Sequence, residues 1–388
     1  MTSHPVTRVR FVAYAVVLGA ALTAGIVLNR MSRLANRPDS GDLVAESLDE
    51  LILASRVASV RRIRITLGHE VFRVGVRPSR EMEEFGGIGD GAIFTDGSAL
   101  VSDALKLRLV LLGPSAENVE VIGRAGEGPG EFRELLSLYA GFGDRVYVLD
   151  NALFRLTSFD RVDGGLQLVK TARVSGNSST ACDWRGEYVS LEYTAANERI
   201  LHLSSSDAGE AQAFGPPLRK VSHRLNFQLT LGRLICAPEV DAVFLAAETG
   251  DLVAIHPNGK PVWRVVIEDF EPTEITEIGE GVVRMTTAPP PENRSTSIGR
   301  FVRLNDSLAV LQLLVFERWN SKGKSVVGQT GVDTRIIDLR SGKQLGRQAD
   351  LPEFLAIRGS HALVTADEPV PWVGMREFSL AAPLVDEQ

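Results

Sequence analysis

The stretch GRAGEGPGEFRELLSLYAGFGDRVYVLD, residues 123–150, contains every part of a pattern that runs through the chain. A loop dense in glycine and proline leads to Phe132, and a turn at Gly143–Asp144 precedes the apolar strand Arg145–Leu149, which ends on Asp150. The second half of this unit, a turn followed by an apolar strand and an acidic or amide residue, recurs five more times. The sequence is therefore built from a repeated strand unit.

The six repeats end on equivalent polar residues, which lie 42 to 64 positions apart. These residues are Asp103, Asp150, Glu192, Glu248, Gln312 and Asp367. A period of this size indicates one supersecondary unit that must stack on its neighbours to bury both faces. Further strands follow most of these residues, which gives four strands per unit. Six four-stranded sheets in a ring leave only short edges, so we predict an all-β fold, a six-bladed β-propeller.

The sixth unit reaches the end of the chain after its third strand, Met375–Leu380. An earlier strand, Arg62–Leu67, alternates polar and apolar residues and belongs to no unit. We expect it to pair with Met375–Leu380 and close the ring, because closure buries an open sheet edge. The predicted propeller spans residues 58–388, and a juxtamembrane linker or helix spans residues 39–57.

The N-terminal segment, residues 1–38, is predicted to contain a transmembrane or signal helix. Residues 11–28 carry no charge, and Arg10 and Arg30 flank them. As a helix they would span about 27 Å, close to the roughly 30 Å of bilayer hydrocarbon. We predict that this helix anchors the protein to a membrane, with the large domain in the periplasm or elsewhere outside the cytoplasm. The alternative is a signal peptide that is cleaved to release a secreted domain.

Composition excludes several classes of function. The net charge of −7 repels phosphate backbones, so we expect no nucleic-acid partner. Two cysteines are too few for a multi-cysteine zinc site, and the six histidines show no metal-ligand spacing. Cys182 and Cys236 precede the apolar strands of adjacent units, where they could form a disulfide in an oxidising compartment or remain two buried thiols.

A family resemblance supports the same fold. The string GEGPGEF at Gly126–Phe132, followed by Val146–Asp150 and Ser158–Asp160, resembles the bacterial six-bladed β-propeller family that is related to NHL-repeat proteins. The resemblance covers about residues 57–388, and the specific motif occurs once. It implies a propeller that follows a signal or lipoprotein segment. Many members have no assigned activity, so the resemblance concerns fold more than function.

Four residues are candidates for ligand binding. Glu127 and Glu131 flank Gly-Pro-Gly and either hold a cation or basic partner, or are solvated side chains of a loop whose path the glycine and proline set. Trp319 and Trp372, which we place in loops, could stack on a sugar. The segment 269–297 departs from the repeat and is either a binding loop or a decoration.

The acidic residues that end the repeats have two interpretations. They could line the channel as a ring that binds Ca²⁺, or they could accept hydrogen bonds from turn backbones, which is the usual role of aspartate at strand ends. We favour the second interpretation and predict no catalytic residue and no cofactor. The sequence thus predicts a non-catalytic binding or scaffold module for a partner protein or ligand. The alternatives are a lactonase-like hydrolase with an axial metal and a glycan-binding propeller.

Overall fold

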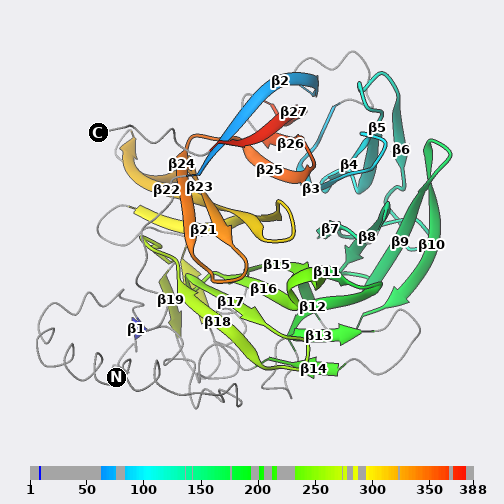
Figure 1. The fold of residues 1–388 in the computed structure, drawn as a ribbon. Helices are drawn as coiled ribbons and strands as arrows, with labels where there is room; N and C mark the ends of the chain where they lie inside the picture. Colours follow the sequence, from blue (N-terminus) through cyan, green and yellow to red (C-terminus); the bar gives the residue numbers. More distant parts are fainter. Residues whose placement is uncertain are drawn as a thin grey trace, which may run out of the picture.

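The structure is a computed structural model. It describes residues 8–9, 63–75, 84–135, 137–141, 143–174, 177–193, 201–204, 212–215, 232–272, 274–277, 283–286, 294–321, 324–366 and 370–381. Six antiparallel sheets of four strands each follow one another around a ring, and we number them as blades one to six (Figure 1). A short 3₁₀ helix, Pro238–Val240, connects β15 (Gly232–Ala237) to β16 (Ala242–Ala247) in blade four.

The strands of blades one to five follow one another in the chain, whereas blade six combines three late strands with one early strand. Blades one to three contain β3 (Ile88–Ile93), β4 (Ala99–Asp103), β5 (Arg108–Leu112), β6 (Val119–Ile122), β7 (Ser137–Ala140), β8 (Arg145–Asp150), β9 (Arg155–Val162), β10 (Gly165–Arg173), β11 (Asn177–Trp184), β12 (Glu187–Tyr193), β13 (Leu201–Ser204) and β14 (Gln212–Phe214). Blades four to six contain β15 (Gly232–Ala237), β16 (Ala242–Ala247), β17 (Asp251–Ile255), β18 (Pro261–Val266), β21 (Arg294–Arg303), β22 (Leu308–Ser321), β23 (Lys324–Asp338), β24 (Gln344–Ala349), β25 (Glu353–Arg358), β26 (His361–Ala366), β27 (Trp372–Ala381) and the early strand β2 (Arg64–Val74).

The middle strands contain apolar runs because those runs are buried on both faces. In β4, Ala99 and Val101 pack toward blade six, whereas Leu100 packs toward blade two. A strand buried on both sides has no solvent face, so its sequence reads as a continuous apolar run instead of an alternation. This packing explains the strand part of the repeat.

The core is divided into clusters that lie between neighbouring blades. The described residues form six such clusters, one for each pair of adjacent blades around the ring. An open stack of sheets has one interface fewer than it has sheets. Equal numbers of sheets and interfaces therefore mean that the ring is closed, and the first strand of each blade contacts the first strand of the next.

Ring closure uses the early strand, as the sequence predicted. The blue strand β2 lies beside the red strand β27 in Figure 1, and Ile65 pairs with Leu380. The strand is longer than expected and continues to Val74, with two irregularities in its register. Ile65 packs between blades five and six, while Phe72 packs between blades six and one. The added strand thus contributes to two interfaces.

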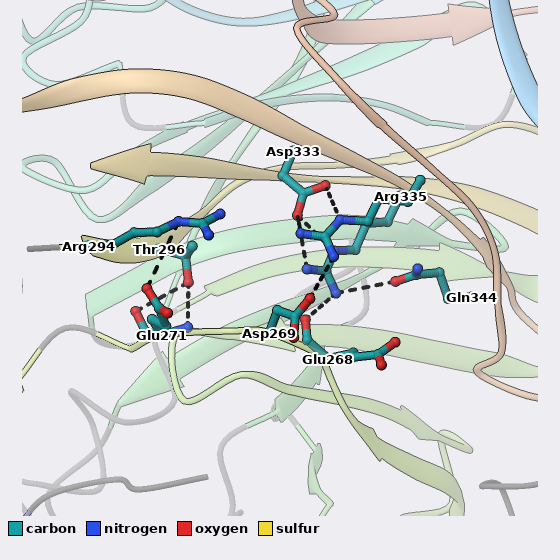
Figure 2. A network of polar contacts seen from close by, with 9 residues as sticks. Glu268, Asp269, Glu271, Arg294, Thr296, Asp333, Arg335 and Gln344 are labelled. Carbon is teal, nitrogen blue, oxygen red and sulfur yellow. Dashed lines mark hydrogen bonds and ion pairs between the residues drawn. The ribbon is translucent and has the colours of Figure 1, made fainter. Parts of the chain in front are cut away.

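A buried ion network joins blades four and five (Figure 2). Arg335, on β23, is 1% exposed and donates to the Asp333 carboxylate at 2.9 Å and to the carbonyl of Glu268, which follows β18. Arg347, on β24, donates from Nε to Oδ1 of Asp333 at 3.0 Å. It also forms an ion pair with Asp269 at 2.7 Å. Burial lowers the pKa of Arg335, and Asp333 opposes that effect. The network links two blades through charged side chains.

One region differs from the sequence-based expectation, and the predicted anchor and linker lie outside the residues that the structure describes. The segment 269–297, expected as a loop, contains a hairpin of β19 (Glu274–Glu277) and β20 (Val283–Thr286), and β1 (Arg8–Val9) pairs with β19. The predicted anchor at residues 11–28 and the linker at 39–57 lie outside the described residues. Within the described ranges, no helix is long and apolar enough to cross a membrane.

Candidate functional site

A cavity of about 1100 Å³ lies where the first strands of the six blades converge. All six of these strands line it, with Asp90, Leu138, Ala181, Leu234, Phe301 and Ile357. The turns that connect first and second strands also line it, among them 143–145, 185–186 and 238–239. The cavity therefore follows the ring axis and reaches the face of the molecule that carries these turns.

The ionisable side chains of the cavity are mainly basic. Its arginines are Arg145, Arg161, Arg185, Arg233, Arg300, Arg303 and Arg358. Its acidic residues are Asp90, Asp144, Asp160, Asp183 and Glu239. Seven arginines and five acidic residues line the cavity, although the whole chain carries −7, and four of these arginines also pair with acids that do not line it: Asp96, Asp241, Asp306 and Glu353. Positive charge is left where a cavity arginine has no acid in contact. Fixed charge of one sign in a concave, low-dielectric site attracts the opposite charge.

An ion network joins four blades around the cavity. Arg300 of blade five forms ion pairs with Asp90 of blade one at 2.8 Å and with Glu353 of blade six at 3.1 Å. The second oxygen of Asp90 accepts a hydrogen bond from the Leu138 N–H in blade two. Four blades are thus tied together beside the axis, and the charge of Arg300 is compensated within the protein.

Two further arginines lie near the mouth and are also compensated. Arg145 donates two hydrogen bonds to Asp160, at 2.7 and 2.8 Å, and this contact lowers the pKa of Asp160. Arg358 donates to Asp144 at 2.9 Å and to the Ile93 carbonyl at 3.0 Å. These pairs fix the turns around the mouth.

Arg233 differs from the other six cavity arginines. Its Nε donates to the Gly299 carbonyl at 3.2 Å. Among the residues that the structure describes, no carboxylate lies within 4 Å of its guanidinium, whereas each of the other six has such a partner. Arg233 is therefore the cavity arginine whose charge has no carboxylate in contact among the described residues.

An aromatic group occupies the cavity wall between blades two and three. Tyr139 and Tyr147 stack with their ring centroids 5.2 Å apart, and the Tyr147 hydroxyl donates to Asp183 at 3.2 Å. Burial, followed by the charge of Asp183, raises the pKa of Tyr147 to about 12, and burial also raises the pKa of Asp183. This wall combines apolar surface with a carboxyl group that protonates more readily than usual.

Cys182 and Cys236 form a disulfide in the same wall. The bond joins β11 of blade three to β15 of blade four, with the Cα atoms 5.5 Å apart. Of the two alternatives that the sequence left open, the structure contains the bonded one. Both sulfur-bearing residues line the cavity, so the bond fixes two of its six inner strands.

The predicted pair Glu127 and Glu131 lies in the loop between blades one and two and does not line the cavity. Glu131 accepts hydrogen bonds from the Gly128 N–H and from Arg124, which lower its pKa. Glu127 forms an exposed ion pair with Arg133 at 3.0 Å. Each glutamate is thus paired within its own loop.

The GEGPGEF loop itself is held by the blade that follows it. Arg155 donates to the carbonyls of Glu127 and Gly128 and to that of Glu131. Phe132 is fully buried between blades one and two. These contacts give the motif a structural role in spacing the two blades.

Trp319 and Trp372 lie in strands, which corrects their predicted place in loops. Trp319 is on β22, is 44% exposed and has its ring over Gly328 of β23. Trp372 begins β27, and the Arg73 guanidinium lies 4.2 Å from its ring centroid. Neither ring lines the cavity.

Those residues ending the repeats whose side chains the structure describes accept hydrogen bonds from backbone N–H groups, and none of them lines the cavity. Asp103 accepts from Gly86 and Gly87, and Asp150 accepts from Arg133 and Leu153. The equivalent side chains of Glu192 and Asp367 lie outside the described residues. In the described ranges, no group of three His, Cys, Asp or Glu side chains is arranged to hold a metal ion.

Glu248 and Gln312 are equivalent residues that act alike in blades four and five. Glu248 accepts hydrogen bonds at 3.0 Å from Ser297 and from the Ile298 N–H of the next blade. Gln312 accepts at 2.7 Å from the Phe354 N–H of its own next blade. Burial raises the pKa of Glu248 to about 7. The hydrogen bond from the backbone N–H of the next blade is therefore accepted by an ionisable carboxyl group, Glu248, in blade four and by a neutral amide, Gln312, in blade five.

Glu248→Gln is expected to remove a pH dependence of stability. Because the folded-state pKa of Glu248 lies above its unfolded value, the folded state binds the proton more tightly. The free energy of unfolding should then fall by about 3 kcal/mol as the pH rises from about 4.5 to above 7. Glutamine keeps the acceptor without the charge, so the variant should equal the wild type near pH 4.5 and exceed it near pH 9.

Urea unfolding at both pH values measures this difference. Gln312→Glu is the converse control, because it introduces an acid at the equivalent buried position, where the amide also donates to the Pro352 carbonyl, and it should add a pH dependence of the same sign. Parallel pH profiles for wild type and Glu248→Gln would contradict the role assigned to Glu248.

Comparison with known proteins supports the ring architecture. No family model and no curated protein matches the chain. Among solved structures, a member of the DUF4221 family from Bacteroides vulgatus has a TM-score of 0.52 at 6% identity, covering 84% of this chain and 100% of that chain. The chain is a β-propeller.

Two other solved structures are more distant. A protein of Bacteroides fragilis described as exported has a TM-score of 0.47 at 12% identity, over 85% of this chain and 98% of its own. The β-propeller domain of Cps50 (Swd1) from Myceliophteria thermophila has a TM-score of 0.42 at 8% identity, over 77% and 100%. At these identities the likeness concerns the fold alone.

Proposed function

We propose that this propeller is an extracytoplasmic binding module whose axial cavity receives an anionic ligand with an apolar body. The observation that carries the proposal is Arg233, which lines a cavity of about 1100 Å³ and has no carboxylate within 4 Å among the described residues. Pockets for small ligands are mainly apolar and hold a few placed polar groups, in volumes of roughly 300–1,000 Å³. Apolar side chains line this cavity beside the charged ones, among them Leu234, Phe301, Leu355 and Ile357.

The compartment is proposed from two observations. Disulfides persist in oxidising environments outside the cytoplasm, and both cysteines of the chain are in one. The sequence of residues 11–28 has the length and the apolar, uncharged character of a membrane anchor or signal helix. We propose that this segment holds the propeller at a membrane or directs its export.

The placement of side chains favours ligand binding in the cavity over the two alternatives, a hydrolase with an axial metal and a glycan-binding propeller. The acids of the predicted metal ring are occupied with backbone donors, as in Asp103 and Asp150. One face of Trp372 is covered by Arg73, which competes with a stacked sugar. The cavity, in contrast, presents surface that a ligand can reach through the face of the turns.

Filling the mouth tests the proposed site. Ala140 is an exposed residue of β7 that lines the cavity, so Ala140→Trp should narrow it without disturbing the core. The probe is 8-anilinonaphthalene-1-sulfonate, an anion with an apolar body whose fluorescence rises in apolar sites. We expect saturable binding at one site of the full-length protein and a loss of affinity of about tenfold or more in Ala140→Trp.

The matched control is Val266→Trp, which adds the same ring at an exposed position on β18, away from the cavity. It should leave the affinity unchanged. Equal binding of the dye by wild type and Ala140→Trp would show that the axial cavity is not the site.

A further inference from the structure

We propose that Arg233 binds the carboxylate of a monocarboxylic ligand whose apolar body extends along the cavity toward the mouth. This inference rests on the proposed function, because it names the group that the axial cavity recognises. It follows from the geometry of Arg233, from the charge around it and from the surface between it and the mouth.

The backbone around Arg233 fixes its guanidinium. The ladder between β21 and β22 has an irregularity between Ile298 and Arg300, which leaves Gly299 out of the register. The Gly299 carbonyl accepts the hydrogen bond from Arg233 Nε. Bulges often redirect backbone groups in this way beside functional sites. With Nε held, the plane of the guanidinium is set, and neither terminal nitrogen has a hydrogen-bond partner among the described residues.

The charge around Arg233 calls for a single negative charge. Arg300, the other deep arginine, is compensated by Asp90 and Glu353. Glu248 is the carboxyl group whose charge Arg233 influences, but it forms no ion pair with Arg233 and is bonded to Ser297 and Ile298. One uncompensated cation is matched by a monoanion. The planar fork of arginine fits a carboxylate with two parallel hydrogen bonds.

Arg233 lies deep in the cavity. It is the second residue of β15, and that strand runs from Gly232 to the mouth at Pro238. At about 3.3 Å per residue, Arg233 is roughly 13 Å from the end of the strand. Apolar side chains line part of this length, among them Ile235, Phe301 and Val302, beside Arg300, which is already paired. A ligand with its carboxylate on Arg233 would bury its apolar body against these residues.

Matched acids and amides test the inference. The probes are 4-phenylbutyrate against 4-phenylbutyramide, and N-acetyl-Leu-Leu with a free carboxylate against its carboxamide. Each pair differs in the charged group alone. For the full-length protein, calorimetric titration should show each bound acid to be about tenfold tighter than its amide. In Arg233→Gln this preference should vanish, and in Arg233→Lys part of it should return because the charge remains.

The control variant is Arg133→Gln, which removes an exposed arginine that lies outside the cavity and is paired with Glu127; it should keep the preference for acids. Circular dichroism and thermal melting establish that the variants are folded. Tighter binding of the peptide acid than of phenylbutyrate would identify the end of a polypeptide as the source of the carboxylate, and the reverse would identify a small acid.

Equal affinity of wild type for acids and amides, or a preference that survives in Arg233→Gln, would overturn the inference. The sulfonate dye separates this failure from that of the proposed function. If dye binding is lost in Ala140→Trp but the acids show no preference, only the role of Arg233 is wrong. If the dye does not bind in the cavity, the proposed function fails as well.

Discussion

Deletion of residues 58–68 is expected to abolish the cooperative thermal unfolding of the propeller. The deletion removes the first part of β2, including Ile65, which is buried between blades five and six. Burial of one such side chain contributes about 2–5 kcal/mol, and the edge of β27 would also lose its ladder hydrogen bonds. Together these losses approach the roughly 5–15 kcal/mol that stabilise a whole domain.

Differential scanning calorimetry of two deletions measures this effect. The control lacks residues 1–40 and retains β2, so it should keep a sharp transition near that of the full-length protein. The milder variant Ile65→Ala should unfold cooperatively with a lowered transition temperature. Equal transitions for the two deletions would show that β2 does not hold the ring closed.

Arg335→Met is expected to destabilise the protein by about 3–5 kcal/mol, because removing one partner of a buried ion pair leaves the other uncompensated. Asp333 would keep only Arg347, and the Glu268 carbonyl would lose its donor. The interface between blades four and five contains both losses (Figure 2). Urea unfolding at neutral pH gives the change in free energy.

Arg347→Met is the matched control, because Arg347 binds the same carboxylate from a partly exposed position. Exposed ion pairs contribute about 0–1 kcal/mol, so this substitution should cost far less than Arg335→Met. If the two variants lose equal stability, burial of Arg335 is not the cause of its effect.

The middle strands of the blades could be predicted from the sequence because both of their faces are buried. The apolar runs at Ala99–Asp103 and Arg145–Asp150 therefore could not be mistaken for amphipathic helices or half-exposed strands. The pairing of β2 with β27 was also predictable, since an incomplete sixth unit and an unassigned strand leave one economical arrangement. The Cys182–Cys236 bond was foreseen only as one of two alternatives.

The cavity could not be predicted because its residues share no local signal. Its arginines come from five different blades, and the sequence does not distinguish Arg233, which has no described acidic partner, from Arg300, which has two. The tryptophans were misplaced because β22 and β27 extend beyond their apolar cores. Trp319 lies in a part of β22 where the other side chains are polar, so the strand period is hidden.

The bond that completes the ring has a consequence for the order of events during synthesis. Arg376 donates to the carbonyl of Gly68, which the ribosome made 308 residues earlier. Translation proceeds at about 5–20 residues per second, so β2 must wait many seconds for its partner. During that interval its edge is open to other chains. A nascent molecule is therefore most vulnerable to aggregation just before its last strand emerges, and any factor that shields β2 would act in that period.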